Sequence, residues 1–146
     1  MMVKQNNFHK DFQLNGNSFS SVNELLKYAE SISETTYQFL KEWFSESDFV
    51  IVQTSGSTGT PKPIQLQKEF IVNSAVATGT YFSLPHKTTA LLCLPTAYIA
   101  GKMMLVRALV LGWHLDHVPS NTTPLQNIEK TYDFSAMVPM QVENSI

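Results

Sequence analysis

The positions of apolar residues along the chain predict helices that alternate with strands. Apolar residues three or four positions apart are typical of a helix with one buried face, and short runs rich in β-branched residues are typical of strands. The expected helices are one that follows a capping box at residues 21–24, then 34–44, 68–82, 98–112, 123–131 and one beginning at Pro139. The expected strands are 49–53, 64–67, 89–94, 113–118 and 134–138.

This alternation predicts an α/β fold with a largely parallel sheet flanked by helices. The first 20 residues are polar, but Phe8, Phe12 and Leu14 are spaced for a short strand or arm. The aromatic stripe of helix 34–44 is more typical of a core than of a ligand wall. Residues 1–47 are therefore expected to form a largely helical lead-in to the domain that follows.

Composition excludes several classes of function. The 146 residues suit one domain with a core, since 43% of them are apolar. A net charge of −2 with scattered basic residues argues against nucleic-acid binding. The single cysteine, Cys93, rules out an internal disulfide and is expected to be a buried thiol. No signal peptide opens the chain, and the apolar stretch 97–113 contains Lys102 and Arg107, so we expect no membrane insertion and a cytoplasmic protein.

Residues 54–62 interrupt the apolar pattern with the string Thr-Ser-Gly-Ser-Thr-Gly-Thr-Pro-Lys, directly after the expected buried strand. Gly56 and Gly59 allow close backbone approach, so that N–H groups can converge on an anion. The hydroxyls add neutral donors, and Lys62 adds a positive charge held outside any helix by its flanking prolines. The composition indicates a phosphate-binding loop between two strands.

Two familiar phosphate loops do not fit this string. A Walker A loop requires Gly-Lys-Ser/Thr after four residues, but Pro61 stands five positions after Gly56. The Rossmann fingerprint also fails, because Ser57 and Thr58 separate the two glycines. A flexible Ser/Thr/Gly hairpin turn remains the structural alternative.

The ordered string resembles the AMP-binding signature of the acyl-adenylate-forming superfamily. The resemblance implies that the loop holds the β- and γ-phosphates of ATP while a carboxylate attacks the α-phosphate, with Mg²⁺ on the phosphates and CoA as the second substrate. Lys62 would be the catalytic residue. The implied nucleotide-binding residues are Thr54, Ser55, Gly56, Ser57, Thr58, Gly59, Thr60 and Lys62.

A second stretch, residues 94–101, is similar to the next motif of this superfamily. It follows an expected strand at the sheet edge where α/β folds gather ligands. The resemblance implies that Tyr98 and Gly101 border the acyl substrate. Tyr98 stands where many relatives carry histidine, and an ordinary buried tyrosine is an equal alternative. Pro63 replaces a glycine that is common after the lysine.

Residues 104–112 and 134–139 most resemble o-succinylbenzoate–CoA ligases, which act in menaquinone biosynthesis. The resemblance covers residues 48–146, a partial AMP-binding domain that lacks the later ribose-binding motif and the mobile C-terminal domain with its lysine. The chain is thus expected to be the N-terminal piece of a longer ligase and inactive by itself. The alternatives are a non-catalytic interaction module with a degenerate adenylate-forming core, or a ligase for another aryl or fatty acid.

The expected partners are a small carboxylate substrate, ATP and CoA, and the sequence is compatible with a homo-oligomer. No protein metal site is expected. His114 and His117 lie three apart on an expected strand, where they face opposite sides. Arg107 could meet a second carboxylate of the substrate, although an arginine reaching to the helix surface is the simpler interpretation.

Overall fold

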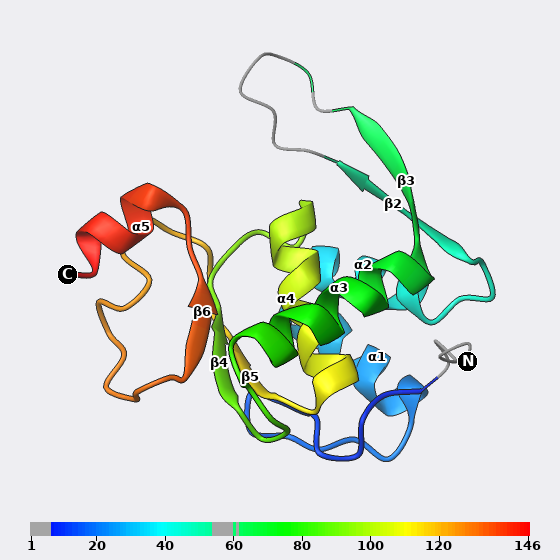
Figure 1. The fold of residues 1–146 in the computed structure, drawn as a ribbon, viewed down its shortest axis with the longest axis horizontal. Helices are drawn as coiled ribbons and strands as arrows, with labels where there is room; N and C mark the ends of the chain where they lie inside the picture. Colours follow the sequence, from blue (N-terminus) through cyan, green and yellow to red (C-terminus); the bar gives the residue numbers. More distant parts are fainter. Residues whose placement is uncertain (1–6, 54–59, 61) are drawn as a thin grey trace.

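Four short strands form a parallel sheet in the computed structural model, which describes residues 7–53, 60 and 62–146 (Figure 1). The strand order is β1-β5-β4-β6, and each neighbouring pair is parallel. The strands are β1 (Gln13–Leu14), β4 (Thr89–Leu92), β5 (His114–His117) and β6 (Phe134–Ala136). The predicted α/β class with a largely parallel sheet is confirmed.

The helices are α1 (Val22–Ile32), α2 (Glu34–Trp43), α3 (Lys68–Tyr81), α4 (Ile99–Leu111) and α5 (Pro139–Asn144). In Figure 1, α1 to α4 lie to one side of strands β4 to β6, and α5 lies to the other. Ser21 and Ser33 cap α1 and α2 by accepting backbone N–H bonds. Helix α4 ends at Gly112, whose φ of 76° is the left-handed conformation that glycine adopts most readily. No helix in the described ranges has the length and apolar character needed to cross a membrane.

The predicted helix over residues 123–131 is wrong. Residues 124–127 form a turn, and no helix follows before β6. Local side-chain bonds compete with helix formation here, since Asn121 Oδ1 accepts from the Thr123 N–H at 2.9 Å and the Thr123 hydroxyl donates to Gln126 Oε1 at 3.1 Å. Only Leu125 and Ile128 supply large aliphatic side chains for a buried face, which is too few to offset that competition.

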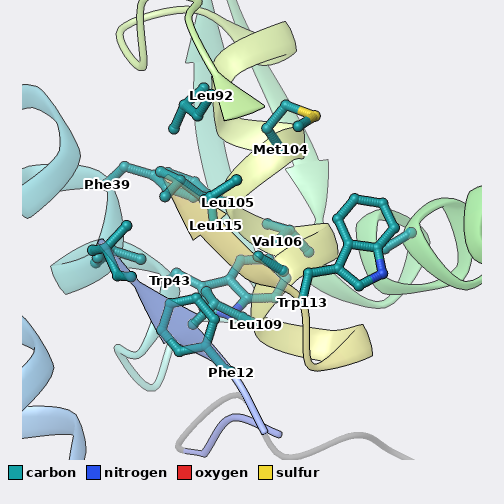
Figure 2. Packing of buried hydrophobic residues seen from close by; sticks show 14 of the residues in the cluster. Phe12, Phe39, Trp43, Leu92, Met104, Leu105, Val106, Leu109, Trp113 and Leu115 are labelled. Carbon is teal, nitrogen blue, oxygen red and sulfur yellow. The ribbon is translucent and has the colours of Figure 1, made fainter. Parts of the chain in front are cut away.

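One hydrophobic cluster joins the lead-in to the rest of the chain. Figure 2 shows Phe12 and Trp43 from the lead-in beside Leu109 of α4. All three side chains are at most 2% exposed. Strand β1 adds to this continuity, because Gln13 and Leu14 pair with His114 and Leu115 at the sheet edge. The region before residue 48 therefore contributes both a strand and two helices to the same core; the boundary at residue 47 stays a prediction.

The remaining two strands, β2 (Phe49–Gln53) and β3 (Pro63–Gln67), form a separate antiparallel hairpin. The strand before the loop, expected to be buried, is buried on one face only: Val50 and Val52 are buried, but Ile51 is 49% exposed. On β3, Ile64 is 41% exposed. The hairpin projects away from the parallel sheet, so no layer covers its outer face (Figure 1).

Candidate functional site

The predicted phosphate loop closes the hairpin. Gln53 pairs with Pro63, so residues 54–62 connect two adjacent antiparallel strands. The strand–loop–strand arrangement is confirmed. This loop is much longer than the two to five residues of ordinary hairpin loops, as is typical of functional loops. Thr60 and Lys62 are both exposed and therefore accessible to a ligand. The positions Thr54 to Gly59 lie outside the described residues, so their phosphate contacts stay predictions.

Two contacts hold β2 and the start of α3 against α2 and the residues that follow it. The Ile51 N–H donates to Glu42 Oε2 at 3.0 Å, and the Lys68 ammonium donates to the Ser45 carbonyl at 2.9 Å. Lys68 is only 2% exposed, and burial lowers its pKa while Glu42 and Asp48 oppose that shift. These contacts fix where the hairpin leaves the core and thus where its loop begins.

Tyr98 lies directly beside the strand that enters the loop. It is the N-terminal cap residue of α4, it is half-buried, and it forms an isolated parallel β-bridge with Gln53. Gln53 is the last residue of β2, so the bridge brings the two sequence motifs together although they are far apart in the chain. The role of Tyr98 toward an acyl group stays a prediction.

Gly101 has a packing role in the first turn of α4. It is buried, and a Cβ atom at this position would lie 2.3 Å from the carbonyl oxygen of Pro95. Only glycine permits this close approach. The contact explains the glycine without any ligand; a direct contact of Gly101 with the substrate is still a prediction.

A groove of about 620 Å³ runs between α2 and the turn that precedes α4. Lys102 lies at this groove with its ammonium 5.4 Å from the ring centroid of Phe39, and it donates to the Ala97 carbonyl at 3.1 Å. Burial lowers the pKa of Lys102, and Glu42 opposes that shift. The groove is lined by Glu34, Thr35, Gln38, Phe39, Lys41, Glu42, Ser45, Ala97 and Lys102. Phe39 is only 3% exposed, so its ring contributes little accessible surface, and charged side chains such as Glu42 and Lys102 line the groove close to Tyr98.

Sequence analysis missed a hydroxyl network beneath the same turn. The Thr36 hydroxyl lies 2.7 Å from His117 Nε2 and 2.8 Å from the Thr96 hydroxyl. Burial lowers the pKa of His117. A threonine among the core-facing positions of helix 34–44 was the available signal, because a buried hydroxyl requires a partner. No group of three or more metal-ligating side chains occurs in the described part of the chain.

Gln141 ties together the carboxyl ends of the strands. Its side-chain amide donates to the Cys93 carbonyl at 2.9 Å and to the Asn121 carbonyl at 2.8 Å, and its oxygen accepts from the Val138 N–H at 3.1 Å. Cys93 is fully buried, as predicted, and burial raises the pKa of its thiol. The edge at which α/β folds bind ligands is thus fixed by a buried side chain.

Arg107 lies far from this edge. Its guanidinium carbon is 6.0 Å from the ring centroid of Phe134, the first residue of β6, which pairs with Ala90 near the start of β4. The substrate-side residues Tyr98 and Gly101 are at the opposite end of α4. Burial lowers the pKa of Arg107. The position gives no support to a contact between Arg107 and a ligand at the carboxyl edge.

Comparisons with known proteins agree with this architecture. The family model described as AMP-binding enzyme matches residues 2–139. An acyl-CoA synthetase (AMP-forming)/AMP-acid ligase II-like protein from Dyadobacter fermentans is 42% identical, with a TM-score of 0.69, over 75% of this chain and 31% of its own. The chain therefore spans about a third of the length of that protein. No curated protein matches the chain.

A weaker likeness links the chain to the o-succinylbenzoate CoA synthetase of Bacillus subtilis. A structure of that enzyme with the acyl-adenylate intermediate is 20% identical with a TM-score of 0.45, over 72% of this chain and 36% of its own. A structure of the same enzyme with ATP and magnesium ion is 19% identical with a TM-score of 0.45, over 70% of this chain and 28% of its own. Likeness at this level supports no inference about substrate.

Proposed function

The chain belongs to the AMP-binding enzymes, and from that premise we propose that it forms the N-terminal part of an ATP-dependent carboxylate–CoA ligase. The observation that carries the proposal is the bridge between Gln53 and Tyr98. It sets the segment predicted to border the acyl group beside the strand that leads into the predicted phosphate loop. A ligase that joins a carboxylate to the α-phosphate of ATP requires these two parts to be neighbours.

The residues of the loop would act by positioning and by charge neutralisation. The exposed Lys62 side chain would contact the phosphate oxygens, and Thr60 would add a neutral hydroxyl donor. Lys62 is the only charged residue of the loop. Its loss would therefore destabilise the transition state most, because negative charge moves onto the leaving pyrophosphate there. Magnesium fits this hydroxyl-rich loop, because it is normally held by substrate phosphates and water with few protein ligands; it would shield the phosphates.

The proposed reaction has two steps. A carboxylate oxygen of the acid forms a bond to the α-phosphorus of ATP, and the bond between that phosphorus and the bridging oxygen breaks to release pyrophosphate. The sulfur of the CoA thiolate then bonds to the acyl carbon, and AMP leaves with the electrons of the mixed-anhydride bond. Tyr98 and the turn that precedes α4 would border the acyl group in both steps.

For the acid itself we propose o-succinylbenzoate, and with it a role in menaquinone biosynthesis in the cytoplasm. Support comes from the segment 134–139 that resembles ligases for this acid. Strand β6 ends at Ala136, two residues before Val138, and α5 begins at Pro139. The groove close to Tyr98 includes Lys102 in its lining, and the ammonium of this residue would pair with the second carboxylate of the acid. Another aryl acid or a fatty acid is the competing substrate.

The test uses the complete protein with ATP, Mg²⁺, CoA and a panel of acids, with AMP release as the readout. We expect the fastest release with o-succinylbenzoate. In ATP–pyrophosphate exchange, Lys62→Ala should reduce the rate about 10²-fold, comparable to the loss of one preorganised donor. Lys27→Ala, which removes an exposed lysine from α1, is the matched control and should leave the rate unchanged.

An unchanged rate of ATP–pyrophosphate exchange in Lys62→Ala would show that the loop does not take part in the reaction. A fatty acid or another aryl acid preferred over o-succinylbenzoate would retain the ligase and correct the substrate. No AMP release with any acid would favour the non-catalytic interaction module.

A further inference from the structure

Three threonine hydroxyls and one imidazole form a continuous hydrogen-bonded chain under the turn that leads into α4. The Thr36 hydroxyl oxygen lies 2.7 Å from His117 Nε2 and 2.8 Å from the hydroxyl oxygen of Thr96. The Thr96 hydroxyl is in turn 2.7 Å from that of Thr35. The chain connects α2, the turn between β4 and α4, and the end of β5, three segments that are distant in sequence.

The central members of this chain are fully enclosed. Thr36 is 0% exposed and Thr96 is 2% exposed, so neither hydroxyl can exchange its protein partner for solvent. A buried hydroxyl that loses its partner costs about 1–3 kcal/mol, which makes the bonds specific for one arrangement of the three segments.

The charge state of His117 sets the direction of the hydrogen bonds. Burial lowers the pKa of His117, which keeps the ring neutral near pH 7, and a backbone hydrogen bond at Val118 opposes that shift. In the tautomer that leaves Nε2 unprotonated, Thr36 donates to Nε2, Thr96 donates to Thr36, and Thr35 donates to Thr96. The direction of all three bonds therefore depends on the tautomer of this ring.

The turn that contains Thr96 is held from two further directions. Its Pro95 carbonyl lies so close to α4 that only glycine fits at position 101. On the other side, Tyr98 is bridged to Gln53. Thr96 lies between these contacts, and its side chain anchors the turn to α2 and β5. Loss of this anchor would remove the side-chain bonds of Thr96 to Thr35 and Thr36 and would leave the backbone of the turn held by the Gln53–Tyr98 bridge and by the packing of Pro95 on Gly101.

We propose that Thr36, Thr96 and His117 are positioning residues whose hydrogen bonds fix Tyr98 beside the strand that enters the phosphate loop. The proposal rests on the proposed ligase function, in which Tyr98 borders the acyl group. None of the three side chains needs to touch a substrate. Their effect should therefore appear on the acid side of the reaction and not on ATP binding.

The kinetic test compares Thr36→Val and Thr36→Ser in the complete protein by ATP–pyrophosphate exchange. Valine removes both hydrogen bonds at nearly constant volume, whereas serine keeps the hydroxyl. We expect Thr36→Val to raise the KM for the acid about tenfold and to change the KM for ATP less than about twofold. Thr36→Ser should stay within about threefold of the wild type. Thr78→Val, which removes a threonine hydroxyl bonded within α3, is the matched control and should change neither constant.

A second readout requires no activity. In NMR spectra of the wild type, His117 should show an unprotonated Nε2, and the backbones of Gln53 and Tyr98 should show a nuclear Overhauser contact. Thr36→Val should weaken that contact and shift the amide signals of Tyr98 and Gly101, while Thr36→Ser and Thr78→Val should retain them. If Thr36→Val does not fold, Thr96→Val, which breaks the same chain at its next member, provides the same comparison.

The two readouts separate the two proposals. If no acid supports exchange in the wild type, the ligase function fails, and the NMR comparison still decides the positioning role. Unchanged Tyr98 signals in Thr36→Val and Thr96→Val would overturn that role, as would equal increases in both KM values. A serine variant as impaired as the valine variant would also overturn it, because the hydroxyl would then not be the group that matters.

Discussion

The parallel sheet and the β2–β3 hairpin bury their strands to different extents. Strand β4 has a neighbour on each side, and Ala90, Leu91 and Leu92 are 0% exposed. The hairpin strands pair with each other, and Ile51 and Ile64 leave 49% and 41% of their surface exposed. Figure 1 shows the hairpin extending beyond the layer of helices.

This difference indicates that the two regions have different roles: the sheet supplies stability, and the hairpin carries the loop predicted to bind ATP. Stability against local opening follows buried apolar surface and the number of protected hydrogen bonds, so the sheet and α4 form the stable part of the molecule. The hairpin adds Val50 and Val52 to the same core but leaves other side chains exposed, and it holds the loop predicted to contact ATP. Its base is fixed at Ile51 and Lys68, and its end is fixed at Gln53.

The largest expected effect comes from truncating a buried side chain in the core that covers the parallel sheet. Leu105→Ala removes a fully buried side chain of α4 and leaves a cavity, which should lower the free energy of unfolding by about 3 kcal/mol. Ile64→Ala on the exposed face of the hairpin should lower it by less than about 1 kcal/mol. Urea denaturation of both variants measures the contrast. Equal losses would show that the hairpin belongs to the same cooperative core as α4.

A somewhat smaller effect is expected at the carboxyl edge of the sheet. Gln141 is 3% exposed, and its side chain is hydrogen-bonded to the Cys93 and Asn121 carbonyls and to the Val138 N–H. Gln141→Leu leaves these buried groups without a partner and should lower the free energy of unfolding by about 2 kcal/mol. Asn144→Ala removes a comparable but exposed bond to the Thr122 carbonyl and is the matched control. A loss no larger in Gln141→Leu than in this control would mean that water replaces the glutamine.

Much of the fold could be predicted because its signals are local. The end of α4 follows from a glycine after an apolar helix, and Gly112 does adopt the left-handed conformation. The hairpin followed from alternating polar and apolar residues around a glycine-rich loop. The helix expected at 123–131 does not form, because the side chains of Asn121 and Gln126 accept hydrogen bonds from Thr123 that compete with helix formation. The spacing of apolar residues gives no information about such bonds.

The rest of the site depends on contacts between distant segments. The Gln53–Tyr98 bridge joins two strand ends whose relative position is set by the whole fold. Thr36 lies among the core-facing positions of its helix, which indicates that its hydroxyl needs a partner, but only the fold shows that the partners are His117 and Thr96. Strand β1 is too short to predict alone, because its pairing with β5 is what makes it a strand.

A more local prediction concerns the base of the hairpin. Glu42→Ala removes the acceptor of the Ile51 N–H, and the loss of about 1 kcal/mol should increase hydrogen exchange at that amide several-fold. Exchange of the Leu91 amide in β4 should not change. Glu34→Ala, whose carboxylate accepts from Gln38 within α2, is the control. Faster exchange throughout the sheet would contradict the independence of the two regions.

The smallest expected effect is a pH dependence of stability, which arises from His117 at the end of β5. Burial lowers the folded-state pKa of His117 below its ordinary value of 6.5. Between these two values the unfolded chain binds more protons than the folded one, so the contribution of His117 to stability is complete above pH 6.5 and is lost as the pH falls toward the folded-state value. Melting temperatures measured from pH 8 to pH 5 should therefore decrease more in the wild type than in His117→Asn. The difference between the two proteins cancels the contributions of all other groups, which both proteins share. An equal decrease of the melting temperature with pH in the two proteins would show that the ring is protonated as readily in the folded protein as in the unfolded chain. In that case the ring would not be the neutral acceptor to which Thr36 donates.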